Sequence, residues 1–74
     1  MNIRIHSRIS FPWILEETLF QAYQEGKRSV DFLILFPVKE SEKDSILDQV
    51  KAHSVVLDAK WRFGTVLFTA YIKY

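Results

Sequence analysis

The stretch VVLDAKWRFGTVLFTAYIKY, residues 55–74, constrains the fold more than any other part of this chain. Apolar and polar side chains alternate on both sides of Gly64, and a period of two is typical of half-buried strands. Gly64 is the one glycine in the stretch and can adopt a positive φ at low cost. The pattern therefore predicts a β-hairpin with a two-residue loop at Phe63-Gly64.

A two-residue loop also sets the register of the hairpin. It pairs Trp61 with Val66, Ala59 with Phe68, Leu57 with Ala70 and Val55 with Ile72 on one face. Each alanine then meets a large partner, as an interdigitated core requires. The other face would carry Val56, Asp58, Lys60, Arg62, Thr65, Leu67, Thr69 and Tyr71. We expect the first face to be core and the second to be open.

The chain has to fold by side-chain packing alone, because its 74 residues include no cysteine for a disulfide or a thiolate metal site. A composition that is 49% hydrophobic and 15% aromatic is rich enough for one domain over residues 1–74. The lack of cysteine fits a cytoplasmic protein. The N-terminus has no unbroken apolar segment of the signal-peptide type, and the longest apolar run, Phe32–Val38, is too short to span a membrane.

Residues 2–10 alternate and predict the first strand. Its isoleucines, Ile3, Ile5 and Ile9, share one face, while Arg4, His6 and Arg8 share the other. Such a strand has one covered face and one open face.

A helix is predicted next, because Pro12 suits a first helical turn and Gly26 suits a C-terminal cap. Its apolar stripe is Leu15, Thr18, Leu19, Ala22 and Tyr23. Trp13 and Phe20 lie beside this stripe. The favoured interpretation is that this broad face packs partly on a second helix, or that Trp13 precedes the helix. The alternative is an exposed aromatic pair that meets a partner.

Val30–Val38 is almost continuously apolar, which is typical of a strand buried on both faces. Phe32, Ile34 and Phe36 are expected to face the helices, and Asp31, Leu33 and Leu35 to face away. Ser41-Glu42-Lys43-Asp44 resembles a capping box and predicts the start of a short second helix. Ile46, Leu47 and Val50 form its apolar stripe, and it should end near His53.

The elements therefore follow the order βαβαββ. Right-handed crossovers, with the two most apolar strands at the centre, predict an α+β two-layer sandwich. Its four-stranded mixed sheet has the order 1-2-4-3, and both helices cover one face. This topology resembles that of the C-terminal domain of bacterial translation initiation factor three, the archaeal chromatin protein Alba and the small TusA/SirA-like proteins. The resemblance spans the whole chain but lies in element order only. Phe11 precedes Pro12 where TusA-like proteins have Cys-Pro, so no functional residue is carried over.

The face turned away from the helices has an apolar centre and a basic rim, although the formal net charge is only +1. The predicted partner-binding residues are Arg4, Arg8, Leu33, Leu35, Lys60, Arg62, Leu67 and Tyr71. An apolar centre with a charged rim is typical of protein interfaces. The chain is therefore expected to be a non-catalytic binding or regulatory protein, an adaptor or inhibitor of a larger assembly, which could also self-associate as a homodimer.

Two alternatives for this face remain open. The basic rim and Tyr71 could bind single-stranded nucleic acid. The long arginine and lysine stems could instead cover the leucines and leave the face solvated.

The sequence contains no motif for catalysis. His6 and His53 do not have metal-ligand spacing, and Gly26 and Gly64 are too isolated to form a phosphate-binding loop. No serine shows the base that a nucleophile needs. We therefore expect no enzyme activity, no cofactor, no metal and no small-molecule substrate.

Overall fold

The computed structural model describes residues 1–73; Tyr74, the last residue of the predicted hairpin, lies outside the described residues. The strands are β1 (Asn2–Ile5), β2 (Ser29–Ile34), β3 (Val56–Phe63) and β4 (Leu67–Ile72). The helices are α1 (Phe11–Gln24), the short 3-10 helix η1 (Glu40–Glu42) and α2 (Lys43–Lys51).

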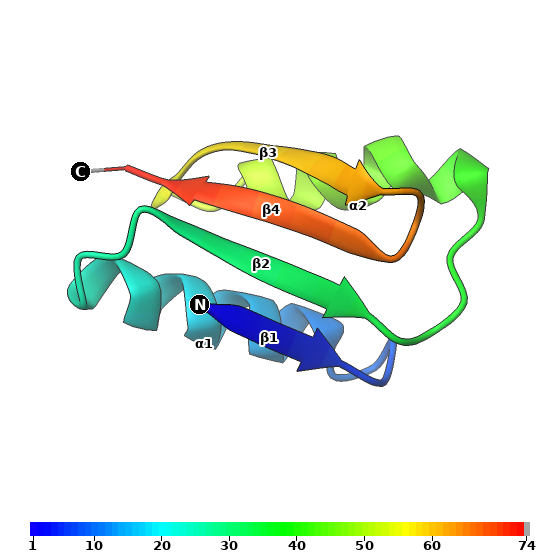
Figure 1. Cartoon of the computed structure of the whole chain (residues 1–74), viewed down its shortest axis with the longest axis horizontal. Coiled ribbons are helices and arrows are strands. Elements are labelled where there is room, and N and C mark those ends of the chain that lie inside the picture. The colour runs from blue at the N-terminus through cyan, green and yellow to red at the C-terminus, as the bar shows by residue number, and fades with distance from the viewer. Residues whose placement is uncertain (74) are drawn as a thin grey trace.

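The strands form one mixed sheet in the order β1-β2-β4-β3. β1 is parallel to β2, and β4 is antiparallel to both of its neighbours. Figure 1 shows α1 and α2 together behind the sheet, so that one face is covered and the other is open. The predicted α+β sandwich, its element order and its sheet order are confirmed.

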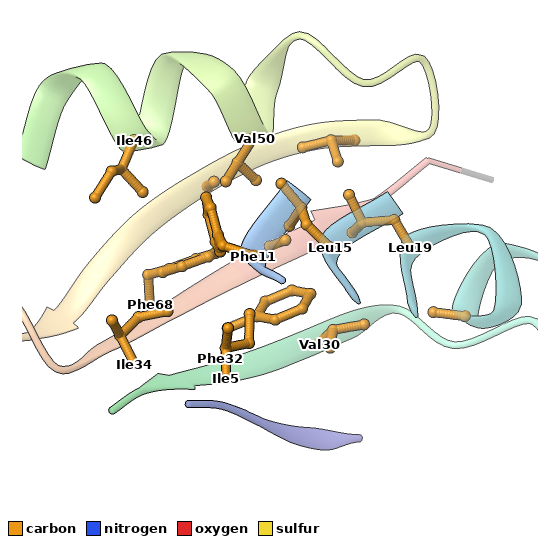
Figure 2. Packing of buried hydrophobic residues seen from close by; sticks show 14 of the residues in the cluster. Ile5, Phe11, Leu15, Leu19, Val30, Phe32, Ile34, Ile46, Val50 and Phe68 are labelled. Carbon is orange, nitrogen blue, oxygen red and sulfur yellow. The ribbon is translucent and has the colours of Figure 1, made fainter. Parts of the chain in front are cut away.

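The core fills the space between the covered sheet face and the helices, and Phe68 of β4 stands at its centre (Figure 2). The Phe68 ring stacks on Phe32 with 5.0 Å between centroids, and it meets the edges of Trp61 at 5.2 Å and Phe11 at 6.4 Å. The helices contribute Phe11, Leu15, Thr18, Leu19, Ala22, Ile46 and Val50. The orientation predicted for β2 is confirmed, since Phe32 and Ile34 are buried in this core.

The C-terminus of α1 has the predicted glycine cap. Gly26 has a φ of 72°, a left-handed conformation that glycine adopts without strain. The Gly26 N–H donates to the Tyr23 carbonyl at 3.2 Å, and the Lys27 N–H donates to the Ala22 carbonyl at 2.9 Å. This pair of bonds is a Schellman motif, and it stops α1 sharply before β2.

The hairpin forms, but the predicted register is wrong. The loop contains three residues, 64–66, and Trp61 pairs with Phe68 instead of Val66. Irregularities between Val56 and Asp58, and again between Trp61 and Phe63, add residues to β3. A bulge reverses the side-chain alternation beyond it. Val56 is therefore in the core, while Leu57 and Phe63 are exposed.

Two local predictions near the chain's turns are also wrong. The first strand ends at Ile5, not at Ser10, and Ile9 lies exposed in the turn that follows. Ser41 does not cap the second helix. Instead, the Lys39 N–H donates to Oε1 of Glu42 at 3.1 Å, and this bond closes the turn of η1. The turn is therefore closed by a carboxylate three residues further along the chain, as in the predicted capping box, but the residues are Lys39 and Glu42 instead of Ser41 and Asp44.

The favoured interpretation of Trp13 and Phe20 is wrong as well. Trp13 lies within α1, and its side chain is 72% exposed. Phe20 is 53% exposed. The two α-helices cover different parts of the sheet, α1 behind β1 and β2 and α2 behind β3 (Figure 1), so the outer face of α1 does not pack on α2. Among residues 1–73, no helix has the length and apolarity needed to cross a membrane.

Candidate functional site

The open sheet face carries a row of apolar side chains that crosses the strands. Leu33 of β2 pairs with Leu67 of β4, and Leu67 pairs with Phe63 of β3. Arg4 of β1 pairs with Leu33 and ends the row. Side chains alternate along a strand, and the neighbouring Phe32 and Phe68 are buried in the core, so this row faces away from the helices. We call Leu33, Leu67 and Phe63 the apolar row.

A polar row runs beside it, with Asp31 of β2 at its centre. Asp31 pairs with Asn2 of β1 on one side and Thr69 of β4 on the other, and Thr69 pairs with Lys60. The Thr69 hydroxyl donates to Oδ1 of Asp31 at 2.6 Å. The Asn2 amide, oriented with its nitrogen toward Asp31, donates to Oδ2 at 3.1 Å. Both carboxylate oxygens of Asp31 are therefore occupied within the sheet.

A third group of side chains brings together Lys60, Arg62 and Tyr71, all of which the sequence predicted for this face. Nη1 of Arg62 donates to the Tyr71 hydroxyl at 3.2 Å. Nζ of Lys60 lies 5.8 Å from the centre of the Tyr71 ring, within cation–π distance. The two cations thus hold Tyr71 between them.

The cations of the open face have no carboxylate partner. Within residues 1–73, the ion pairs join Arg8 to Glu42, Lys43 to Glu40 and Lys51 to Asp58. Arg4, Lys60 and Arg62 are in none of these pairs. Asp58 is neutralised by Lys51 at 3.6 Å and accepts the Ala59 N–H at 2.8 Å. The open face therefore has an excess of positive charge.

Arg8 does not belong to this face, contrary to the sequence prediction. Its Nη1 donates to Oε2 of Glu42 at 2.7 Å, and its Nη2 donates to the Pro37 carbonyl at 2.6 Å. The guanidinium also lies 5.0 Å from the centre of the Phe36 ring. The displacement occurs because β1 ends at Ile5, so the alternation that would carry Arg8 onto the face stops three residues earlier.

The turn around Glu42 favours the charged form of its carboxyl group. The Lys39 N–H and, second, the Arg8 guanidinium lower the pKa of the Glu42 carboxyl below its ordinary value. Arg8 therefore ties the start of η1 to the turn after β1, and it is a structural residue more than a binding one.

Leu35 lies just past the end of β2, where its N–H donates to the Ile5 carbonyl at 2.8 Å. It is exposed, as is Val66 in the hairpin loop. The Ile34 N–H donates to the Val66 carbonyl at 2.6 Å, so the loop closes against this end of β2. These two residues extend the apolar surface beyond the apolar row.

Phe63 is the residue of this face that sequence reasoning missed. It is 74% exposed and pairs with Leu67, whereas the sequence prediction placed it in the two-residue loop. Two shallow hollows lie along the apolar row, and both are lined by Asp31 and Leu67. The first is also lined by Asn2, Ile3, Arg4 and Leu33. The second is also lined by Arg62, Phe63 and Thr69. The only signal for Phe63 in the sequence is its position next to the loop glycine.

Comparison with protein-family models, with curated proteins and with solved structures gave no match to this chain. Among residues 1–73, no three histidine or carboxylate side chains gather in a way that could hold a metal ion. The apolar row and its unpaired cations are therefore the basis for a functional proposal.

Proposed function

We propose that this chain is a non-catalytic binding or regulatory protein that binds an anionic partner protein on its open sheet face. The observation that carries the proposal is the apolar row, flanked by Arg4, Lys60 and Arg62, which form no ion pair within residues 1–73. Apolar side chains gain free energy when a partner covers them, and unpaired cations select a partner that brings carboxylates. An adaptor or an inhibitor of a larger assembly works in this way.

Phe63 and Leu67 are expected to contribute most of the binding free energy. Burying one large apolar side chain contributes about 1.5–3 kcal/mol. Phe63 is the most exposed member of the apolar row, so it has the most surface to bury. The cations act mainly on the association rate, because exposed charges are screened by salt. The absence of cysteine accords with a reducing compartment, and we place this function in the cytoplasm.

Single-stranded nucleic acid is a second candidate, because Phe63 adds an aromatic side chain to a face that already carries Tyr71. Bases bind such faces by stacking on free aromatic rings. Lys60 lies over the Tyr71 ring, however, and Arg62 holds its hydroxyl. Leu33 and Leu67 offer bulk but no ring to stack on. These contacts favour a protein partner over a nucleic acid.

Site-specific photo-crosslinking in the host cell tests the proposal. A benzophenone amino acid at position 67 is expected to give a discrete protein adduct. The same amino acid at position 48, an exposed position on α2, is the matched control and should give none. Replacing Lys60 and Arg62 with glutamate should weaken the adduct at position 67, since the partner is expected to be anionic.

The outcomes separate the two candidates. An adduct that nuclease digestion removes would favour nucleic acid, and a titration of single-stranded oligonucleotide against salt would then measure the number of phosphate contacts. Adducts of equal yield at positions 67 and 48, or none at 67, would rule out a docking role for the open face.

A further inference from the structure

The outer face of α1 is a second exposed surface, and it is both aromatic and acidic. Trp13 and Phe20 are two helical turns apart and therefore lie on one side of the helix. Both side chains are more than half exposed. Glu16 and Glu17 lie between them in the sequence, on the same side of the helix. Neither carboxylate takes part in an ion pair or a side-chain hydrogen bond within residues 1–73.

This surface complements the open sheet face in charge and in polarity. The sheet offers the apolar row with unpaired Lys60 and Arg62, and the helix offers two aromatic rings with unpaired Glu16 and Glu17. The sheet face has a net positive charge, since Arg4, Lys60 and Arg62 outnumber Asp31, and the α1 face has a negative one. Pairing of two sheet faces, or of two α1 faces, would therefore bring like charges together, whereas pairing of a sheet face with an α1 face joins opposite charges.

The apolar row of the open face has no cover within the described chain. In β2, Val30, Phe32 and Ile34 are covered by the helices, whereas Leu33 lies on the other side beside the hydrogen-bonded Asp31. An element that covers this face has to bring apolar side chains over the apolar row, and the outer face of α1 offers Trp13 and Phe20.

The spacing of the two rings agrees with the length of the apolar row. Trp13 and Phe20 are seven residues apart, which corresponds to about 10 Å along α1. Leu33, Leu67 and Phe63 lie on three adjacent strands, which spans about 10 Å across the sheet. A helix that crosses the central strands along the apolar row can therefore place both aromatic rings over it.

We propose that α1 of a second copy of this chain docks on the open sheet face. Trp13 and Phe20 of one copy cover the apolar row of the next, and Glu16 and Glu17 approach Lys60 and Arg62. The inference rests on the proposed function, because it names a partner with an acidic surface, the α1 face, for the same sheet face. The contact is head-to-tail, so each copy still presents one free sheet face and one free α1 face, and assembly continues into a chain or a closed ring.

Two variants that each disable one surface test this arrangement. Trp13→Ser, with Phe20→Ser, disables the α1 face, and Leu67→Glu disables the sheet face. All three positions are at least partly exposed, so both variants should fold, which circular dichroism can verify. Asp48→Ser on the exposed side of α2 is the matched control. The measurement is sedimentation velocity over a series of protein concentrations at low and high salt.

The wild-type chain and the Asp48→Ser control should increase in mass with concentration, and salt should oppose the increase. Each single-face variant alone should stay monomeric, with association at least about 30-fold weaker. An equimolar mixture of the two variants should form a dimer and nothing larger, because only one intact α1 face and one intact sheet face remain to pair.

Three results would overturn the inference. Self-association of the Trp13 and Phe20 variant alone would indicate a sheet-to-sheet dimer, and self-association of the Leu67 variant alone would indicate a helix-to-helix dimer. A wild-type chain that is monomeric at all concentrations would exclude a second copy as the partner. In that last case the proposed function still stands or falls by the crosslinking experiment, where an adduct to a different protein supports it and no adduct at position 67 refutes it.

Discussion

The two faces of the sheet are built from the same strands but are completed in different ways. Phe68 and Leu67 are adjacent in β4, yet Phe68 is fully buried among three aromatic rings while Leu67 lies between two shallow hollows. The side chains of the covered face are buried against the helices of the same chain. On the open face the polar row around Asp31 and the Tyr71 side chain have partners within the chain, whereas the apolar row stays partly exposed.

This difference assigns stability and recognition to alternate residues of one strand. A small chain without cysteine has little stability to spare, and the rings of Phe32, Phe68 and Trp61 provide much of it on the covered face. The open face keeps its shape through backbone pairing and the Asp31 hydrogen bonds. The side chains of the apolar row are therefore not needed for stability and can serve binding. Substitutions at neighbouring positions should therefore have very different consequences.

The largest difference is expected between Phe68→Ala and Leu67→Ala. Phe68→Ala removes the ring at the centre of the core and should lower the free energy of unfolding by about 3–5 kcal/mol, which is a large part of the total for a chain of this size. Leu67→Ala should change it by less than about 1 kcal/mol, because Leu67 is only partly covered. Urea unfolding followed by circular dichroism measures both.

Phe68→Leu is the variant to use if Phe68→Ala does not fold, and it should still cost more stability than Leu67→Ala. Equal losses of unfolding free energy at positions 67 and 68 would mean that the open face contributes as much to stability as the covered face. Binding should show the reverse order, with Leu67→Ala the more damaging of the two wherever both proteins fold.

Thr69→Val should have an intermediate effect and tests the polar row. Valine has nearly the shape of threonine but cannot donate to Asp31, which then keeps only the Asn2 amide. Thr69 is almost fully buried, so the loss of a hydrogen bond to a charged group should cost about 1.5–3 kcal/mol. A double-mutant cycle with Asp31→Ala isolates the pair. Strictly additive losses would show that the Thr69–Asp31 bond contributes nothing.

The sequence predicted the topology because its signals are regional. Alternation predicts β1, a continuous apolar run predicts β2, and the Gly26 cap predicts where α1 ends. The sheet order then follows from the right-handed crossovers between the strands. Seven of the eight predicted site residues were not displaced by the errors in register. Arg4, Leu33, Leu67, Lys60, Arg62 and Tyr71 line the open face, and Leu35 lies at its end.

The errors in the predicted hairpin register come from β-bulges, each of which adds one residue to β3. A period-two pattern in the sequence does not show where a bulge lies. Val55, Val56 and Leu57 are all apolar, so a bulge among them changes which one is buried without changing the pattern. The second bulge turns Phe63 outward in the same way. Arg8 was misplaced because nothing in the alternation of residues 2–10 shows that pairing with β2 ends at Ile5. Its actual partner, Glu42, lies 34 residues away in the sequence.

The Arg8–Glu42 pair lies outside both faces, and its removal should have the smallest effect. The pKa of Glu42 is lowered in the folded protein, so the unfolded state binds more protons near the ordinary value of 4.5. The stabilisation of the Glu42 carboxylate, by the Lys39 N–H first and by Arg8 second, is therefore present above pH 4.5 and is lost as the pH falls through the lowered pKa. Glu42→Gln should make stability fall less steeply in this acid range. Urea midpoints measured between about pH 2 and pH 7 provide the test.

Asp48→Asn is the matched control for Glu42→Gln, because it also removes one exposed carboxylate but breaks no ion pair or side-chain hydrogen bond within residues 1–73. If the midpoints of Glu42→Gln and of the wild-type chain ran parallel from pH 7 to acid, neither the Lys39 N–H nor Arg8 would stabilise the Glu42 carboxylate in solution. Arg8 would then be free to turn toward the open face, and that face would gain the eighth residue that the sequence assigned to it. If the curves converge below pH 4.5, a smaller effect of Glu42→Gln in a chain that also carries Arg8→Gln assigns part of it to Arg8, keeps Arg8 at the turn and limits the cationic rim to Arg4, Lys60 and Arg62.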